Sequence, residues 1–189
     1  MAELTDQDRR VLLKLARSTV AAKLAADSPA ANSAAASPAL AEKRGCFVTL
    51  HKKGMLRGCI GTIEPVESLL ANVEENALNA AFRDPRFPPL KRDELPLVTF
   101  EVSVLSVPQV LDYDDAVDLL SKLKPGIHGV ILERGWQRAT FLPQVWQQLP
   151  DKKAFLENLC QKAGMARSAW KQGDLTVKIY QAEYFSEPD

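Results

Sequence analysis

The sequence predicts an α+β fold, in which a twisted mixed or antiparallel β-sheet is flanked by helices. Segments with a period of two residues are interspersed with segments that have a helical period. Two pairs of extended segments are joined by short glycine-containing turns, which is typical of antiparallel hairpins rather than of parallel βαβ units. Of the 189 residues, 46% are hydrophobic, so the chain can form one domain with a substantial core.

The first predicted element is a helix that begins after Thr5 and ends near Ala26. Thr5 and Asp8 are spaced like a capping box, although Glu or Gln is the usual second residue. Apolar residues then recur at helical spacing. The next segment, 27–40, is rich in Ala, Ser and Pro, so we expect a flexible connection with at most one stray helical turn.

Residues 47–63 predict a β-hairpin. "FVTL" and "MLRGCI" are extended, and "HKKG" between them places Gly54 where a positive φ is favourable. Gly58 and Gly61 are expected to end the returning strand irregularly, because glycine in a strand marks a bulge or a close approach. Pro65 suits the first turn of a helix with an apolar face that extends to Ala81.

The second half of the chain predicts three further strand regions and three helices. "LVTFEVSVLSV" is the clearest strand, and its alternation places Phe100 and the valines on one face and Glu101 and Ser103 on the other. The remaining predicted elements are a helix at 114–123, a hairpin at 127–142 that turns at Arg134-Gly135, a helix at 143–149, a helix from Asp151 to Gly164, and a last strand at 175–185.

The composition argues against several classes of protein. Lys plus Arg and Asp plus Glu number 24 each, whereas a dedicated nucleic-acid-binding protein carries a basic excess. The three cysteines are not the even set of a secreted disulfide scaffold. The charged N-terminus lacks the apolar stretch of a secretory signal, and no apolar run is long enough to span a bilayer. We therefore expect a cytoplasmic protein with reduced thiols and without membrane association.

The sequence carries no standard metal or cofactor motif. Neither Cys-x-x-Cys nor His-Glu-x-x-His occurs, and the glycine-rich cradles of nucleotide-binding proteins are absent. The acids between Asp112 and Asp118 lack the spacing of a calcium loop, and the N-terminus of a helix explains them better. We expect no metal and no cofactor held by this chain.

The heptapeptide "LRGCIGT" is the strongest candidate for a functional site. Arg57 and Cys59 share a face if the strand is regular, so the arginine would favour the thiolate. In the alternative interpretation, Arg57 lies on the opposite face and pairs with a carboxylate. Gly58 and Gly61 would free backbone N–H groups close to a helix. Three interpretations remain open: a catalytic thiol, a binding cleft without chemistry, and a small buried residue in a turn. We favour the cleft, lined by Arg57, Gly58, Cys59, Gly61, Thr62 and Arg86.

A cysteine nucleophile requires a base, and the sequence offers few. Four strand residues at about 3.3 Å each would place His51 roughly 13 Å from Cys59, too far for direct contact. His128 and Glu101 are the remaining candidates, although His128 is as well explained by a solvent-facing turn and Glu101 by an edge strand. Cys46 would face Cys59 across the hairpin in one register, which makes a redox pair conceivable.

The proline-rich loop "RDPRFPPLKR" also has two interpretations. Arg83 and Arg86 would present a binding lip to an anionic ligand. Alternatively Asp84 pairs with an arginine and Phe87 fills the core, which we favour because a long ordered loop needs such an anchor.

Six segments, in order along the chain, resemble those of the AMMECR domain, in its prokaryotic form called AmmeMemoRadiSam system protein A. They are "FVTL…LRGCIGTIEP", "AAFRDPRFPPL", "LVTFEVSVLS", "PGIHGVIL", "FLPQVWQQLPDKKAFLENLCQKAG" and "VKIYQAEYF". The resemblance covers residues 5–185 and implies one α+β domain of two lobes, with LRGCIGT in a cleft near their junction.

The resemblance implies partner proteins but does not imply a reaction. Prokaryotic members are associated with a Memo-like protein and a radical S-adenosylmethionine protein. We therefore expect an accessory or substrate-binding subunit of a modification pathway, present as a monomer or weak dimer. A cysteine-dependent enzyme that uses Cys59, and a nucleic-acid-binding module, are the alternatives.

Overall fold

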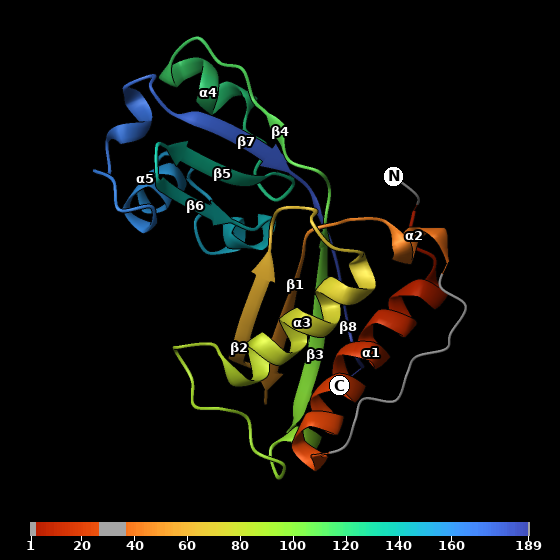
Figure 1. Ribbon diagram of the computed structural model, residues 1–189. Helices are drawn as coiled ribbons and strands as arrows, with labels where there is room; N and C mark the ends of the chain where they lie inside the picture. Colours follow the sequence, from red (N-terminus) through yellow and green to blue (C-terminus); the bar gives the residue numbers. More distant parts are fainter. Residues whose placement is uncertain (1–2, 27–36, 189) are drawn as a thin grey trace. The chain divides into compact units, whose positions relative to one another are not determined.

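The computed structural model describes residues 3–26 and 37–188 (Figure 1). The chain divides into two compact units: unit 1 comprises residues 1–107 and 183–189, and unit 2 comprises residues 108–182. The structure has two antiparallel four-stranded sheets together with helices, which confirms the α+β class. Most of the predicted connection, residues 27–36, lies outside the described residues.

Unit 1 is built on a sheet whose strand order is β2-β1-β3-β8. Its helices α1 and α3 cover one face of this sheet, as Figure 1 shows. Its elements are α1 (Asp6–Ala25), α2 (Pro38–Ala41), β1 (Cys46–Lys52), β2 (Met55–Thr62), α3 (Leu69–Phe82), the 3₁₀ turn η1 (Leu95–Leu97), β3 (Val98–Leu105) and β8 (Ala182–Ser186).

The start of α1 confirms the predicted capping pair. The Thr5 hydroxyl accepts a hydrogen bond from the Asp8 N–H, and the Asp8 carboxylate accepts one from the Thr5 N–H at 2.9 Å. Aspartate therefore completes a capping box here, although Glu or Gln is the usual residue. The helix ends at Ala26, which adopts the left-handed conformation with φ of 59°.

Helix α3 begins later than predicted. It starts at Leu69 rather than near Pro65, because the Ser68 hydroxyl caps it by accepting from the Ala71 N–H. The carbonyl of Glu42 also accepts from the Leu69 N–H at 2.8 Å. This polar anchoring fixes the first turn, and a stable cap outweighs the preference of proline for a helix start.

The β1–β2 hairpin turns at Lys53 and Gly54, both with positive φ, as predicted for Gly54. The prediction that Gly58 and Gly61 end the returning strand irregularly is wrong. Strand β2 pairs with β1 continuously from Gly58 to Thr62. The irregularity lies at Arg57 instead, where two residues of β2 oppose one of β1 and form a β-bulge.

Unit 2 has its own sheet, with the strand order β4-β7-β5-β6, and its own apolar core. Trp146 and Phe155 stack in this core with ring centroids 3.6 Å apart. The hairpin turn falls on Gly135 and Trp136. The elements are β4 (Gln109–Val110), α4 (Ala116–Lys122), β5 (Gly129–Arg134), β6 (Gln137–Phe141), η2 (Pro143–Gln147), α5 (Lys152–Lys162), η3 (Ala169–Lys171) and β7 (Thr176–Tyr180).

The predicted last strand, 175–185, is two strands. Strand β7 belongs to the sheet of unit 2, whereas β8 belongs to the sheet of unit 1, and Gln181 separates them. The prediction failed because no glycine or proline marks the change of sheet. Asp151 and Gly164 bound α5 as predicted: Asp151 caps it, and Gly164 follows it with φ of 75°.

Candidate functional site

The candidate site lies on the face of the unit 1 sheet that α1 and α3 leave uncovered. Thr49 on β1 is directly opposite Cys59 on β2 and directly opposite Glu101 on β3. We call these three side chains the Cys59 row. Their chain neighbours Leu50 and Phe100 are fully buried on the helix-covered face. Because side chains alternate along a strand, the Cys59 row is on the other face.

The two glycines of "LRGCIGT" make room for this chain itself. A Cβ at Gly58 would lie 2.2 Å from the carbonyl oxygen of Ala80 in α3. A Cβ at Gly61 would lie 2.2 Å from the Phe47 ring. Both glycines therefore permit the close approach that the sequence indicated, but the approaching groups are a helix backbone and an aromatic ring of this protein.

The outer edge of β2 is closed at Cys59 by an ion pair. The Cys59 N–H donates to Asp84 Oδ2 at 2.9 Å, and Arg86 Nη2 donates to the Cys59 carbonyl at 3.1 Å. Arg86 also holds Asp84 through two hydrogen bonds of 2.9 and 2.7 Å. These two side chains supply what a neighbouring strand would give, so they position the backbone of Cys59.

Asp84 is the buried partner and Arg86 the accessible one. The Asp84 side chain is 2% exposed, whereas that of Arg86 is 53% exposed. The hydrogen bonds from Arg86 lower the pKa of Asp84 to about 2, so this carboxylate is charged at neutral pH. The favoured interpretation of the loop, in which Asp84 pairs with an arginine, is confirmed. Phe87 is only partly buried, and Leu90 enters the core instead.

The thiol of Cys59 is half-buried and accepts a hydrogen bond from the Thr49 hydroxyl, with Oγ1 and Sγ 3.3 Å apart. Burial raises the pKa of this thiol, and the Thr49 hydrogen bond and the charge of Arg86 only partly offset that effect. The thiol is therefore protonated at neutral pH. A protonated thiol is a poor nucleophile, so this environment does not activate it.

Arg57 does not stabilise a Cys59 thiolate, although the alternation of side chains had predicted this role. Because β2 bulges at Arg57, the two residues do not follow regular i, i+2 geometry. The Arg57 guanidinium instead forms two hydrogen bonds to Glu94, at 3.2 and 2.9 Å. Hydrogen bonds from Arg57 and Lys52 lower the pKa of Glu94 to about 2. Arg57 thus ties the loop after α3 to the hairpin.

His51 is closer to Cys59 than the sequence indicated. Cys59 faces Thr49, which is only two residues from His51 on β1, so the offset along the strand is about 7 Å rather than 13 Å. The same alternation gives His51 the face of the Cys59 row. Burial raises the pKa of Glu101, and the charge of His51 partly offsets this shift. The hairpin register therefore gathers a thiol, a carboxyl and an imidazole on one face.

His128 has a structural role in unit 2. Its Nδ1 accepts from the Lys124 N–H at 3.3 Å, and its carbonyl accepts from the Trp146 indole at 2.7 Å. The side chain is buried, and burial lowers its pKa, so the imidazole is neutral at neutral pH. The sequence-based alternative of a solvent-facing turn residue is wrong.

Cys46 is not a partner of Cys59. It faces Thr62 in the hairpin register and is fully buried on the helix-covered side. Burial raises the pKa of its thiol to about 12, although a hydrogen bond from Asn76 acts in the opposite direction. The side-chain amide of Asn76 also reaches Thr62 Oγ1 at 3.4 Å. Thr62 therefore belongs to a polar cluster at the start of β1.

Sequence reasoning did not select Thr49 or assign Asp84 a contact with Cys59. The contact of Thr49 with Cys59 could have been predicted from the hairpin. Counting residue pairs outward from the Lys53-Gly54 turn, with one extra residue at the bulge, places Thr49 opposite Cys59. Asp84 carried no such signal, since its contact depends on how a loop folds back onto the strand edge.

Comparison with known proteins gives the chain its family. The model of the family described as AMMECR1 matches residues 13–185. The chain belongs to the AMMECR1 family. A protein of Methanothermobacter thermautotrophicus is 40% identical over 187 residues, which cover 98% of this chain and 97% of the relative. A Thermofilum pendens protein is 39% identical, covering 99% and 93%.

A solved structure supports the AMMECR1 fold. The crystal structure of the uncharacterized protein PH0010 from Pyrococcus horikoshii superposes with a TM-score of 0.90 at 34% identity. It covers 97% of this chain and 93% of the neighbour. The two-sheet α+β architecture is therefore shared across nearly the whole length.

Residues 3–26 and 37–188 contain no group of three His, Cys, Asp or Glu side chains that could hold a metal ion. No helix within those ranges is sufficiently long and apolar to cross a membrane.

Proposed function

We propose that this AMMECR1 family member is an accessory or substrate-binding subunit whose binding surface includes the Cys59 row and Arg86. It works, in this proposal, with a Memo-like protein and a radical S-adenosylmethionine protein in a modification pathway. In this proposal Arg57 and Gly61 support that surface, whereas Gly58 and Thr62 face α3 and hold β2 from the other side of the sheet. The reaction itself belongs to a partner.

The observation that carries the proposal is the state of Cys59. Its thiol is protonated and its hydrogen-bond partner is a threonine hydroxyl, which is no base. Around it the sheet presents groups suited to recognition: the carboxyl of Glu101 and the half-exposed guanidinium of Arg86. A polar surface with an unactivated thiol supports binding better than covalent catalysis.

The choice of partners rests on the resemblance to the prokaryotic AMMECR domain form. It is consistent with the absence of standard cofactor motifs from this sequence, because a partner would then supply the cofactor.

Reconstitution tests the proposal. The tagged full chain, a Memo-like protein and a radical S-adenosylmethionine protein from the same source are mixed at micromolar concentration and separated by size. We expect a ternary complex that Arg86→Ala weakens about tenfold, the loss of a charge-assisted contact. Lys23→Ala, on the helix that covers the other sheet face, is the control. Retention of neither partner overturns the proposal.

One observation favours a second candidate, a cysteine-dependent enzyme. Glu101 and His51 share the face of Cys59, so a base could approach the thiol when a substrate binds. The alkylation rate of each cysteine against pH, measured by mass spectrometry, decides between the two, with buried Cys46 and Cys160 as internal controls. Fast labelling of Cys59 with an apparent pKa well below about 8.5 would favour the enzyme. Slow labelling supports the binding subunit.

A further inference from the structure

A groove of about 360 Å³ lies in unit 1, between the outer side of α1 and the end of the chain. Its floor includes Leu13 of α1 and Pro188, which follows β8. Arg10, Lys14 and Arg17 of α1 and Glu187 of the chain end also line it. We call it the α1 groove. None of these residues belongs to the Cys59 row, so the proposed function makes no use of it.

The three cations form a stripe along one side of the helix. Arg10, Lys14 and Arg17 have the spacing i, i+4, i+7, so they share a helix face over about 10 Å of its axis. No acidic residue follows Asp8 in α1, so the helix itself supplies no counter-charge there. Any carboxylate that pairs with this stripe therefore comes from another part of the chain or from a ligand.

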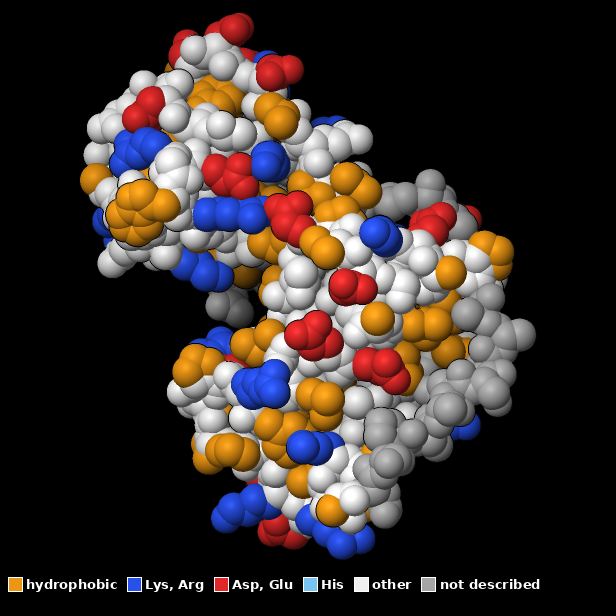
Figure 2. Space-filling model, viewed as in Figure 1, with side chains coloured by type: hydrophobic (Ala, Val, Ile, Leu, Met, Phe, Trp, Pro, Cys, Tyr) orange, Lys and Arg blue, Asp and Glu red, His pale blue; other side chains and the backbone are white. Residues whose placement is uncertain are grey.

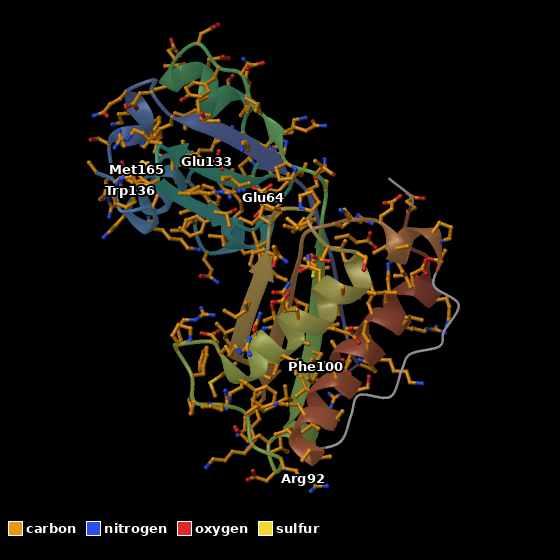
Figure 3. The ribbon with its side chains drawn as sticks, in the orientation of Figure 1. Glu64, Arg92, Phe100, Glu133, Trp136 and Met165 are labelled. Atoms are coloured by element: carbon orange, nitrogen blue, oxygen red, sulfur yellow. The ribbon has the colours of Figure 1, made fainter. Side chains whose placement is uncertain are left out.

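Arg17 forms an ion pair with Glu187 of the same chain. Its guanidinium forms a two-point ion pair with Glu187, and it also donates to the carbonyl of Val98 at 2.6 Å. It further contacts the ring of Phe100, 4.9 Å from the centroid, a residue of β3 that Figure 3 labels beside α1. This end of the groove is thus complete and structural. It also shows that the groove accepts a carboxylate from an extended segment.

Arg10 and Lys14 are in the opposite situation. Both are exposed, and within residues 3–26 and 37–188 neither makes an ion pair or a side-chain hydrogen bond. The neighbouring Arg9 is already bound to Glu183 and Asp6. Among the residues that the structure describes, these two neighbouring cations therefore have no acidic partner beside the apolar floor.

We propose that the α1 groove binds a small amphipathic carboxylate, with its apolar body on Leu13 and Pro188 and its carboxylate at Arg10 and Lys14. The volume is that of a small-molecule site, which typically spans about 300–1,000 Å³. The aliphatic stems of Arg10 and Lys14 extend the apolar floor while their charged ends stay in water. A stable protein partner would need about 800 Å² per side, far more than this groove offers.

Octanoate is the probe, and the full chain is the receptor. Amide chemical shifts in α1 are followed by NMR during titration with octanoate, with 1-octanol and with acetate. Octanoate is expected to saturate the α1 shifts at a concentration at least about tenfold below either control, because only it supplies both the alkyl chain and the charge. Equal midpoints for octanoate and acetate, or for octanoate and octanol, overturn the proposal.

Charge-reversal variants locate the site. Lys14→Glu and Arg10→Glu should each weaken octanoate binding about fivefold, whereas Lys23→Glu on the same helix, outside the groove, should leave it unchanged. Leu13→Gln provides an independent test of the apolar floor and should also weaken binding. Unchanged binding by both Lys14→Glu and Leu13→Gln contradicts the assignment. So does sedimentation showing that octanoate acts only by altering self-association, which would make a second copy the occupant.

Discussion

The two faces of the unit 1 sheet are formed by alternate residues of the same strands, and they differ in burial and polarity. On the helix-covered face, Val48, Leu50 and Phe100 are fully buried against α1 and α3. On the other face, Thr49, Cys59 and Glu101 form a polar row. Core packing and the polar row are therefore separated by one residue along each strand, and substitutions on the two faces should have different consequences for stability.

Phe100→Ala should give the largest loss of stability. The ring is fully buried beneath α1, so its removal leaves a cavity and costs about 3–5 kcal/mol. Urea denaturation of the purified variant measures this cost. Thr99→Ala, the neighbouring position on the other face, is the control and should cost less than about 1 kcal/mol. Similar losses at both positions would remove the distinction between the faces.

Gly58→Ala, on the helix-covered face, should be the next most harmful change, since it forces β2 against α3. The new Cβ would meet the backbone of Ala80, which cannot move as a flexible side chain can, so we expect a loss of about 2–3 kcal/mol. Gly135→Ala is the comparison. It has open space but a positive φ, and should cost about 1 kcal/mol. Thermal and urea denaturation rank the two, and a reversed ranking would contradict the close approach of α3.

The separation of the faces was predictable from the sequence, but the composition of the site was not. The alternation around Phe100 and Glu101 gave both faces of β3 correctly. The expected distance of His51 from Cys59 was wrong, because it assumed an offset of four strand residues, whereas the pairing with its bulge at Arg57 leaves two. The bulge at Arg57, whose side chain bonds Glu94, likewise has no signal in the local sequence pattern.

The division into sheets escaped prediction for a related reason. Residues 175–185 form a continuous extended pattern, and nothing local shows that β7 and β8 pair with different partners. The two-residue strand β4 is too short to have a period at all. Propensity and periodicity therefore recovered the element types, whereas the pairing partners are a tertiary property.

Asp84→Asn should lower the free energy of unfolding by about 1–2 kcal/mol. It should also weaken the contact of the Asp84 side chain with the Cys59 N–H at the edge of β2. The buried carboxylate has a pKa lowered to about 2, so its contribution is fully present above the ordinary Asp value near 4 and is lost as the pH falls toward 2. Urea denaturation between pH 2 and pH 7 should show a shallower acid loss in the variant. Asp93→Asn, an exposed site in the same loop, is the control. An unchanged acid profile would mean that Asp84 does not hold β2.

Charged side chains of both signs lie close together on the surface of unit 1. Figure 2 shows acidic and basic side chains interspersed on the viewed face of unit 1, without a continuous basic field. Local pairs therefore dominate, and each carboxylate must be judged by its own surroundings. Glu94 and Glu101 illustrate this: hydrogen bonds from Arg57 and Lys52 lower the pKa of the first, while burial raises the pKa of the second.

Glu101→Gln should produce the smallest effect, with the opposite sign. Because burial raises the folded-state pKa of Glu101, its charged form is penalised in the folded protein. That penalty is absent below the ordinary Glu value near 4.3, grows as the pH rises from there to the raised pKa, and is fully present above it. The variant should therefore be more stable than the parent at pH 7.5, by less than about 1 kcal/mol, and equal to it at pH 4.

Glu94→Gln is the matched opposite, since removing that carboxylate should destabilise the chain above about pH 4. Urea denaturation at pH 4 and pH 7.5 measures whether each variant is more or less stable than the parent. A sheet face selected for recognition retains such a carboxyl at the expense of stability, which is the expectation for Glu101 if the Cys59 row binds a substrate. Destabilisation by Glu101→Gln at pH 7.5 would instead make Glu101 a structural group, and Arg86 would be left as the candidate recognition residue of the surface.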